Sequence, residues 1–207
     1  MAYDADSTLD LDKYSSIVDL IEKSCAKYGS KTAYACLGKD TTFDEIETLS
    51  RDFAAYLQHC TNLQPGDRVA IQLPNITQFV IAAYGVIRAG LVIVNTNPLY
   101  TERELIHQFN DSGAKALVVL SDLLPSLAKV VKSTPIEHVI STHALDLISP
   151  QVQPKTAMNN VEFNTVLKLG KQHTFVPVKP NHEDLIALQY TGGTTGLSKG
   201  AMLTHRN

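Results

Sequence analysis

Short apolar runs alternate with segments of helical period through most of the chain, and this alternation restricts the fold more than any other feature. It predicts strands at 32–37, 69–73, 91–94, 115–120 and 139–141. It predicts helices over 16–28, 42–57, 76–88, 101–112 and 122–132. Because strands that alternate with helices form parallel sheets, we expect an α/β fold with a mostly parallel sheet flanked by helices.

The predicted boundaries of these elements rest on local capping and turn signals. A serine at position 15 or 16 can cap the first helix, and Thr42 precedes Glu45 at the spacing of a capping box. Asn75 can cap the third helix by the same chemistry. The residues 38–40, Gly-Lys-Asp, are predicted to form the turn after the first strand.

The regular alternation ends near residue 145, and this sets the predicted division of the chain. Prolines and polar residues are frequent from there to residue 180, so we expect an excursion over the surface with one short helix over 163–169. An apolar strand then resumes. We therefore predict an α/β subdomain over 1–145, an irregular connecting segment over 146–182 and a strand–loop–strand unit over 183–207.

The composition indicates a globular protein, because 44% of the residues are hydrophobic and only 19% are charged. A net charge of −3 without any basic run argues against nucleic acid as a partner. Cys25, Cys36 and Cys60 lack metal-ligand spacing and are expected to be reduced thiols packed as small apolar residues. Neither a signal peptide nor an apolar run of ~20 residues is found. We expect a cytoplasmic protein whose membrane contact, if any, is peripheral at the inner membrane.

The segment 190–200, Y-T-G-G-T-T-G-L-S-K-G, carries the strongest chemical signal in the chain. Glycines let a backbone approach an anion closely, and their successive N–H groups form an anion-binding nest. Threonine hydroxyls add donors, and Lys199 adds a full positive charge. A Walker loop is excluded, since it needs lysine directly after the last glycine and a helix behind it. The segment is predicted to cradle a triphosphate between two strands.

Residues 190–200 closely resemble the phosphate-loop motif of the adenylate-forming superfamily, which includes acyl-CoA synthetases, luciferases and peptide-synthetase adenylation domains. They match the motif everywhere except at Ser198, where the family has proline. The Gly192 form of the motif, continued by 200–207, looks most like bacterial long-chain fatty-acid–CoA ligases. The segment 95–101, N-T-N-P-L-Y-T, is also similar to acyl-CoA synthetases and is expected to act as a turn and helix cap. The resemblance covers essentially the whole chain.

This resemblance implies a ligase that uses ATP, Mg²⁺ and coenzyme A and takes a fatty acid as its substrate. It implies catalytic roles for Lys199 and Thr191. The residues that it assigns to the nucleotide phosphates are Thr191, Gly192, Gly193, Thr194, Thr195, Gly196 and Lys199. No metal ligand is expected in this chain, because the family supplies its acidic ligand from a later motif. Since the family's later motifs and C-terminal domain do not follow here, we expect an N-terminal portion that is inactive by itself.

Two other functions stay open at this point. One is a ligase for another carboxylic acid, aryl or medium-chain, and the other is a non-catalytic phosphate-binding remnant; a homodimer is also left open. His107 and His182 are expected to be packed or solvated, whereas His205 is a candidate for the active-site floor because it follows the loop. Glu183 and Asp184 are rejected as magnesium ligands, because they precede the strand and so lie at its end away from the loop.

Overall fold

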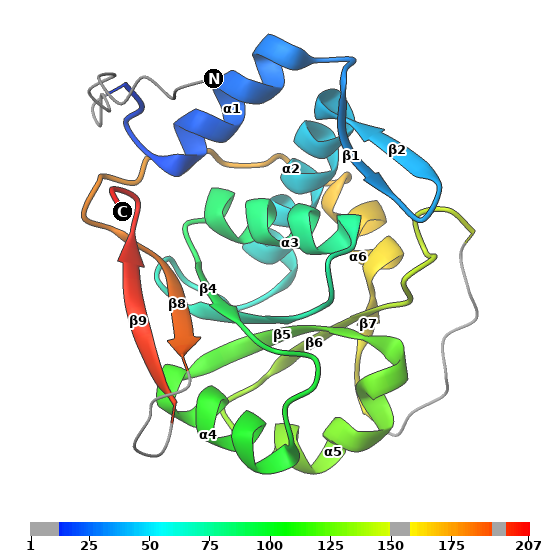
Figure 1. Ribbon diagram of the computed structural model, residues 1–207, viewed down its shortest axis with the longest axis vertical. Coiled ribbons are helices and arrows are strands. Elements are labelled where there is room, and N and C mark those ends of the chain that lie inside the picture. The colour runs from blue at the N-terminus through cyan, green and yellow to red at the C-terminus, as the bar shows by residue number, and fades with distance from the viewer. Residues whose placement is uncertain (1–12, 150–157, 192–197) are drawn as a thin grey trace, which may run out of the picture.

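Figure 1 shows a computed structural model of the protein. The structure describes residues 13–149, 158–191 and 198–207. A seven-stranded sheet runs through the centre of the molecule. Its strand order is β7 (Val161–Glu162), β6 (His138–Thr142), β5 (Ala114–Leu120), β3 (Arg68–Gln72), β4 (Val92–Asn95), β8 (Leu185–Thr191) and β9 (Lys199–Thr204). All neighbouring strands are parallel except β8 and β9, which form an antiparallel pair. The predicted fold class, α/β with a mostly parallel sheet, is confirmed.

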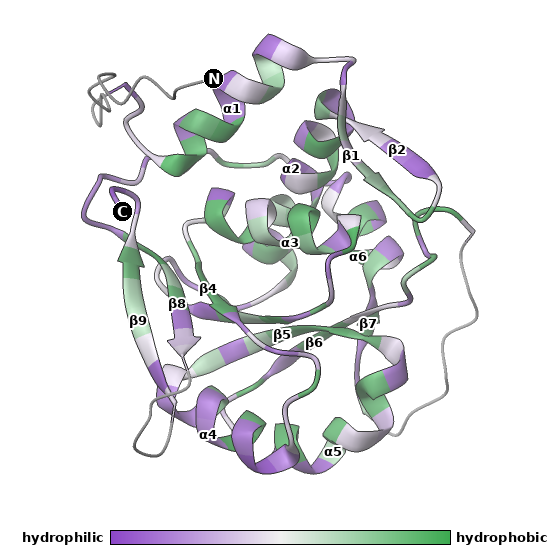
Figure 2. Cartoon of the chain, in the orientation of Figure 1, coloured by the Kyte–Doolittle hydropathy of each residue, from purple (hydrophilic) through white to green (hydrophobic). Residues whose placement is uncertain are grey.

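Helices cover both faces of this sheet (Figure 1). One face carries α1 (Ile17–Tyr28), α2 (Phe43–Cys60), α3 (Thr77–Arg88) and α6 (Phe163–Gly170). The other face carries α4 (Glu102–Ser112) and α5 (Leu124–Lys132), with the short 3-10 turn η1 (Ser121–Leu123) leading into α5. Figure 2 shows that the central strands are mainly hydrophobic, while hydrophilic residues gather on the outer side of α4.

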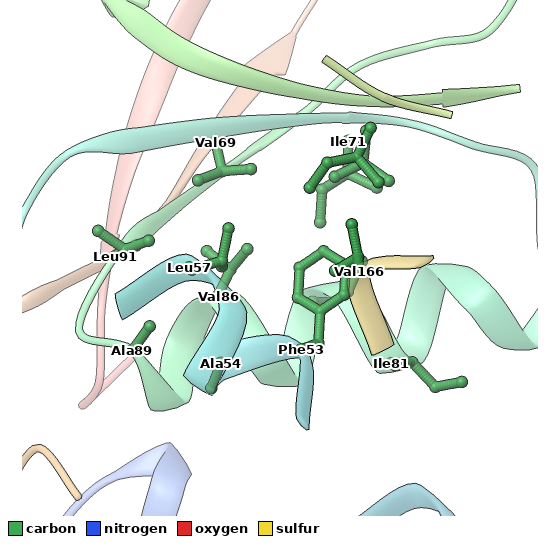
Figure 3. Packing of buried hydrophobic residues seen from close by; sticks show 14 of the residues in the cluster. Phe53, Ala54, Leu57, Val69, Ile71, Ile81, Val86, Ala89, Leu91 and Val166 are labelled. Carbon is green, nitrogen blue, oxygen red and sulfur yellow. The ribbon is translucent and has the colours of Figure 1, made fainter. Parts of the chain in front are cut away.

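Two apolar cores result from the alternation of side chains along the strands. Val69 and Ile71 of β3 point into the core under α2 and α3, whereas Ala70 between them points into the core under α4 and α5. Figure 3 shows Val69 and Ile71 above Phe53 of α2 and Val166 of α6. All five side chains are fully buried, so β3 packs against a helical layer on each face of the sheet.

The helix starts follow the predicted caps in three of four cases, and one of the three is Thr101 at the start of α4. Ser16 caps α1 by accepting the Asp19 amide at 3.2 Å, and Thr42 and Glu45 form the complete capping box of α2. Asn75 does not cap α3, and the prediction was wrong there. The N-cap of that helix is Ile76, which has no side-chain hydrogen bond to offer.

The first two strands form a separate hairpin instead of joining the parallel sheet. Strands β1 (Thr32–Cys36) and β2 (Lys39–Thr42) pair antiparallel with each other alone. The turn between them is Leu37–Gly38, with φ of 51° and 81°, and not 38–40 as predicted. Two consecutive positive φ values are typical of a two-residue hairpin loop, in which a glycine is favoured. Strand β2 was missed because its polar sequence, Lys-Asp-Thr-Thr, lacks an apolar face.

The segment 146–182 is not merely a surface excursion, which corrects the expectation from its prolines. Its described part adds β7 to the edge of the sheet and supplies α6, the predicted short helix. Phe163 of α6 is fully buried, with its ring 5.3 Å from the ring of Phe53. Gly170 brings α6 so close to α2 that a Cβ there would lie 1.8 Å from the Asp52 carbonyl oxygen. The three-part division of the chain stays a prediction, although one sheet contains strands from all three parts.

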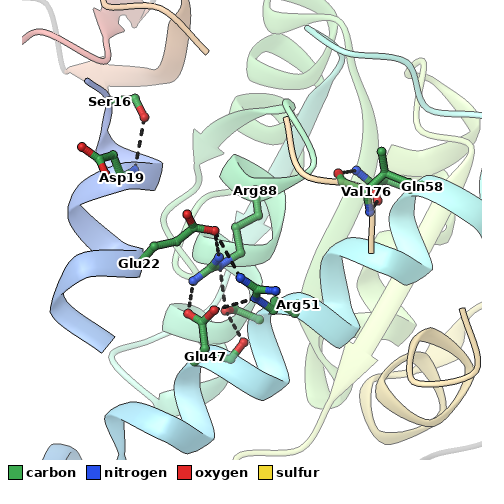
Figure 4. Close-up of polar contacts among 9 residues, drawn as sticks. Ser16, Asp19, Glu22, Glu47, Arg51, Gln58, Arg88 and Val176 are labelled. Atoms are coloured by element: carbon green, nitrogen blue, oxygen red, sulfur yellow. Dashed lines mark hydrogen bonds and ion pairs between the residues drawn. The ribbon is translucent and has the colours of Figure 1, made fainter. Parts of the chain in front are cut away.

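A buried guanidinium ties three helices together on the α1 side of the molecule. Figure 4 shows Arg88 of α3 between Glu22 of α1 and Glu47 of α2. Arg88 is 0% exposed, bonds Glu22 at 2.9 Å, pairs with Glu47 and donates to Ser50 Oγ at 3.1 Å. Arg51 adds a half-exposed second cation to the same two carboxylates. A charge buried this deeply is tolerated only when it is paired and hydrogen-bonded.

No helix among the described residues is long and apolar enough to cross a membrane.

Candidate functional site

The predicted phosphate-binding residues lie where β8 ends and β9 begins. Thr191 is the last residue of β8, Lys199 is the first of β9, and the two face each other in the antiparallel register. Gly192, Gly193, Thr194, Thr195 and Gly196 lie outside the described residues. The two strands predicted on either side of these residues are confirmed, and β9 begins earlier than its apolar residues suggested.

Thr191 ends β8 at the edge of the sheet where ligands of α/β proteins bind. Strand β8 runs parallel to β4, and β4 runs parallel to β3, so all three point their carboxyl ends the same way. In open α/β sheets, ligand sites lie outside these carboxyl ends. A cavity of about 360 Å³ opens there, lined by Ile71, Phe79, Asn95, Thr96, Asn97, Tyr100, Gln189 and Tyr190.

Side-chain amides form the polar floor of this edge. Asn95 donates from Nδ2 to Gln189 Oε1 at 2.8 Å, and Gln108 donates from Nε2 to the Asn95 carbonyl at 2.9 Å. The amide oxygens of Gln72, Asn95 and Gln108 are buried without a hydrogen-bond partner in the described part of the chain. Buried acceptors of this kind require a donor, which is water or a ligand. Of these three residues, Asn95 lines the cavity at this edge, so its amide oxygen is an available acceptor there.

Lys199 is free to meet an anion. Its side chain is exposed, and none of the carboxylates in the described ranges forms an ion pair with it. Thr191 beside it is exposed as well. An ammonium and a hydroxyl at adjacent strand ends supply one charge and one short donor to the same point, which is what a phosphate group requires.

Both ends of the loop contact α4, which the sequence did not indicate. Tyr190 donates its hydroxyl to Asp111 Oδ2 at 2.5 Å, and His107 Nε2 lies 2.9 Å from the Ser198 carbonyl oxygen. Burial raises the pKa of Tyr190, and the Asp111 carboxylate raises it further, so the phenol keeps its proton. His107 is packed, as expected, but against the loop end. The spacing of His107 and Asp111 places them one helical turn apart on α4, but it does not indicate which distant residues they contact.

Gly200 makes room for the Tyr190 ring. The two residues face each other across β8 and β9, and a Cβ on Gly200 would lie 2.9 Å from Tyr190 Cε2 and 3.1 Å from Cζ. We expect Gly200→Ala to displace the ring from Asp111 and to lower the free energy of unfolding by about 1–2 kcal/mol. Urea denaturation measures this. Ala201→Ser, on the exposed neighbouring residue, is the control and should change little; equal stability of both variants would refute the packing argument.

His205 does not lie at the active-site floor, contrary to the expectation from its place after the loop. It follows β9 at the end of the hairpin away from the loop, where its amide bonds the Asp184 carbonyl at 3.1 Å. Its Nδ1 accepts the Ile17 amide at 3.2 Å, which satisfies an otherwise free donor at the start of α1. His205 is thus a structural link between the two ends of the chain, separated by 188 residues.

The pKa of His205 makes this link sensitive to acid. Burial lowers the pKa from 6.5; the nearby Asp184 charge opposes this and His182 adds to it. Since the unfolded chain takes up the proton more readily, stability is full above pH 6.5 and falls as the pH drops below that value. We expect His205→Asn, which keeps an acceptor, to flatten this fall when unfolding free energies are compared at about pH 7.5 and about pH 5.5. His59→Asn, at an exposed imidazole, should keep the wild-type slope, and an unchanged slope in His205→Asn would contradict the assignment.

The remaining candidates carry no chemistry in this structure. His182 Nε2 is hydrogen-bonded to the Tyr14 carbonyl oxygen at 2.9 Å, consistent with the expected packed role. All three cysteines are free thiols; Cys25 is buried, as expected, but Cys60 is exposed. Burial, with the nearby Glu47 carboxylate, raises the pKa of Cys25 to about 11, so it is protonated and unreactive. No group of three or more His, Cys, Asp or Glu residues in the described ranges could hold a metal ion.

Comparison with known families gives one match that spans most of the chain. The family model described as "AMP-binding enzyme" matches residues 21–207. The match includes the hairpin with Thr191 and Lys199 and the whole parallel sheet.

Several curated relatives are long-chain-fatty-acid–CoA ligases. The one from Escherichia coli O6:H1 is 43% identical over 99% of this chain, and the one from Haemophilus influenzae is 46% identical over 96%. The chain spans 39% and 38% of the length of these two relatives. A 4-coumarate–CoA ligase from Pinus taeda is 28% identical over 93% of the chain.

Solved structures show the same fold. A long-chain-fatty-acid-CoA ligase from Archaeoglobus fulgidus superposes with a TM-score of 0.76 at 31% identity, over 92% of this chain and 37% of that one. An anthranilate CoA ligase in complex with anthranoyl-AMP superposes with a TM-score of 0.80 over 93% of this chain and 35% of that one. At 21% identity the latter likeness concerns the fold alone.

Proposed function

Because the chain belongs to the AMP-binding enzyme family, we propose that it is the phosphate-binding portion of an AMP-forming long-chain fatty-acid–CoA ligase. The observation that carries the proposal is the β8–β9 hairpin, which presents Thr191 and Lys199 side by side at the carboxyl edge of the sheet. Identities of 39–46% to curated long-chain-fatty-acid–CoA ligases support the fatty-acid substrate. Only part of those relatives' length is spanned, so the activity is proposed for the complete protein that the gene encodes.

The proposed reaction has two displacement steps. A fatty-acid carboxylate oxygen attacks the α-phosphorus of ATP, and the bond to the β-phosphate breaks, which gives acyl-adenylate and pyrophosphate. The thiol of coenzyme A then attacks the acyl carbon. The acyl–phosphate bond breaks, AMP leaves, and the thiol proton is lost to solvent. Both steps release a leaving group that gains negative charge, so stabilisation of that charge lowers their barriers.

Lys199 and Thr191 are proposed to act in the first step. As pyrophosphate leaves, charge builds up on the β- and γ-phosphates. An ammonium placed at those phosphates stabilises the transition state more than the ground state, which raises turnover rather than affinity. Thr191 adds a hydroxyl donor at the same point. Gly192, Gly193, Thr194, Thr195 and Gly196 are proposed, from the sequence motif, to add backbone and hydroxyl donors to the same phosphates.

Mg²⁺ is proposed as a companion of the ATP phosphates and not as a group that this part of the protein holds. The described residues offer no cluster of three or more potential ligands. Bound to the phosphates, the ion would neutralise charge. No step above is assigned to a metal ligand of this chain.

We also propose a cytoplasmic enzyme. Three free cysteines fit a reducing compartment, in which thiols are not oxidised to disulfides. Peripheral contact with the inner membrane and a homodimer are proposed as well.

The decisive experiment is ATP–pyrophosphate exchange with the complete protein and a panel of carboxylic acids. We expect exchange that depends on palmitate or oleate, followed by acyl-CoA formation when coenzyme A is added. If pyrophosphate exchange depended on 4-coumarate or octanoate but not on palmitate or oleate, the substrate would be an aryl or medium-chain acid instead of a long-chain fatty acid. ATP binding in a calorimeter without exchange for any acid would favour a non-catalytic phosphate-binding protein.

A further inference from the structure

Helix α4 contacts Tyr190, near the end of β8, and Ser198, the residue directly before β9. We propose that α4 is a two-point clamp, in which His107 and Asp111 are positioning residues that set where Thr191 and Lys199 stand. The inference rests on the proposed function, because it assigns a role in placing the charge that meets ATP. Neither residue is proposed to touch the substrate.

The incoming end is held through Tyr190, the residue before Thr191. Its ring is buried, with 6% of the residue exposed, and it packs over Gly200 on the partner strand. Its hydroxyl donates to Asp111 Oδ2 at 2.5 Å. A hydroxyl bonded to a carboxylate makes a short and strong hydrogen bond. The position of Thr191 is thereby coupled to α4.

The outgoing end is held through Ser198, the residue before Lys199. His107 Nε2 lies 2.9 Å from the Ser198 carbonyl oxygen. A carbonyl can only accept, so Nε2 must carry the proton and donate it. The bond fixes the peptide group that leads directly into Lys199. Each loop end is therefore anchored one residue away from a proposed phosphate ligand.

The clamp stands on a rigid support. Helix α4 begins with a complete capping box between Thr101 and Glu104 and ends at Gly113 in the left-handed region. Leu105 and Phe109 are buried in the core beneath the sheet. His107 and Asp111 are four residues apart, so they stand one turn apart on the same side of the helix. His107 and Asp111 are therefore held in a fixed position relative to the sheet.

Within the part of the chain that the structure describes, the hairpin has few other buried contacts near Thr191 and Lys199. Most side chains of β8 are half-buried, those of β9 are mainly exposed, and Met202 is 70% exposed. A strand pair at the sheet edge with few buried contacts opens more easily than a central pair. Loss of an anchor should therefore shift Lys199. A displacement of the order of 1 Å at a catalytic group is enough to reduce a rate by up to about 10²-fold.

The test compares His107→Leu, His107→Gln, Asp111→Ala and the control Arg103→Gln in the complete protein. Glutamine carries an Nε2 donor, whereas leucine removes the donor, and Arg103 is an exposed residue of the same helix. Palmitate-dependent ATP–pyrophosphate exchange gives kcat and the KM for ATP. Hydrogen exchange of the Thr191 and Lys199 amides, followed by NMR, reports the strand ends without requiring activity.

We expect His107→Leu and Asp111→Ala each to lower kcat by about 10-fold, with KM for ATP changed by less than about 3-fold. His107→Gln should recover most of the loss, and Arg103→Gln should behave as wild type. The Thr191 and Lys199 amides should exchange faster in His107→Leu and Asp111→Ala. The thermal midpoint of unfolding should fall by only about 2 °C in these variants.

Three results would overturn the clamp: an unchanged kcat in His107→Leu, equal losses in the leucine and glutamine variants, or unchanged amide exchange at Lys199. If wild-type protein shows no pyrophosphate exchange, the proposed function fails. The proposed positioning role of α4 is then tested by amide exchange alone. Faster exchange of the Lys199 amide in His107→Leu would support this role, and unchanged exchange would refute it.

Discussion

Lys199→Ala should lower the rate of acyl-adenylate formation by about 10²–10³-fold, which is the cost of removing one preorganised donor to developing negative charge. The KM for ATP should change far less. Lys199 stands at the start of β9, exposed and without an ion pair to any carboxylate that the structure describes, so its charge is available to the departing pyrophosphate. Charge grows on that group only as the reaction proceeds, and therefore the loss should fall on kcat.

Single-turnover formation of acyl-adenylate by the complete protein measures this loss, with palmitate and saturating ATP. Lys179→Ala removes an equal charge from an exposed position outside the hairpin and should retain the wild-type rate. A rise in the KM for ATP with kcat unchanged would mean that Lys199 only binds the nucleotide. An unchanged rate at every ATP concentration would remove Lys199 from the proposed mechanism.

Arg88→Met should lower the free energy of unfolding by about 3 kcal/mol, the lower end of what breaking a buried ion pair costs. The guanidinium is 0% exposed and holds Glu22, Glu47 and Ser50 together between three helices (Figure 4). Methionine fills much of the volume but leaves the carboxylate of Glu47 near an apolar side chain. We expect the lower end of this energy range because the side chains of Glu22 and Glu47 are 39% and 25% exposed, so their carboxylates can rotate into water.

Arg51→Met is the matched control, since Arg51 reaches the same two glutamates from a side chain that is 44% exposed. A half-exposed ion pair contributes about 0–1 kcal/mol, so this variant should stay within that range. Guanidinium denaturation at neutral pH measures both. Equal losses for the two arginines would show that burial of Arg88 does not decide its contribution, and a negligible loss for Arg88→Met would show that methionine packs there without cost.

Most features that depend on a few consecutive residues could be predicted from the sequence. The capping boxes of α2 and α4 place a threonine three residues before a glutamate, and both signals lie within one helical turn. The apolar runs of β3, β4 and β5 show continuous burial because helices cover both faces. Thr191 and Lys199 were identified through the chemistry of the glycine-rich segment between them. A pattern confined to a few residues keeps its meaning whatever surrounds it.

Local patterns along the chain were thus enough to predict the α/β class and nearly all of the helices and strands. The assignment of residues 191–199 to a phosphate stays a prediction. Contacts between distant segments separate β1 and β2 from the main sheet, bring α6 into the core and let His205 accept the Ile17 amide at the start of α1. The tertiary structure also placed His107 and Asp111 at the loop ends, 91 and 79 residues away from their partners. These contacts depend on which surfaces come together when the helices pack against the sheet. Local sequence patterns carry no signal for a hydrogen bond between segments so far apart.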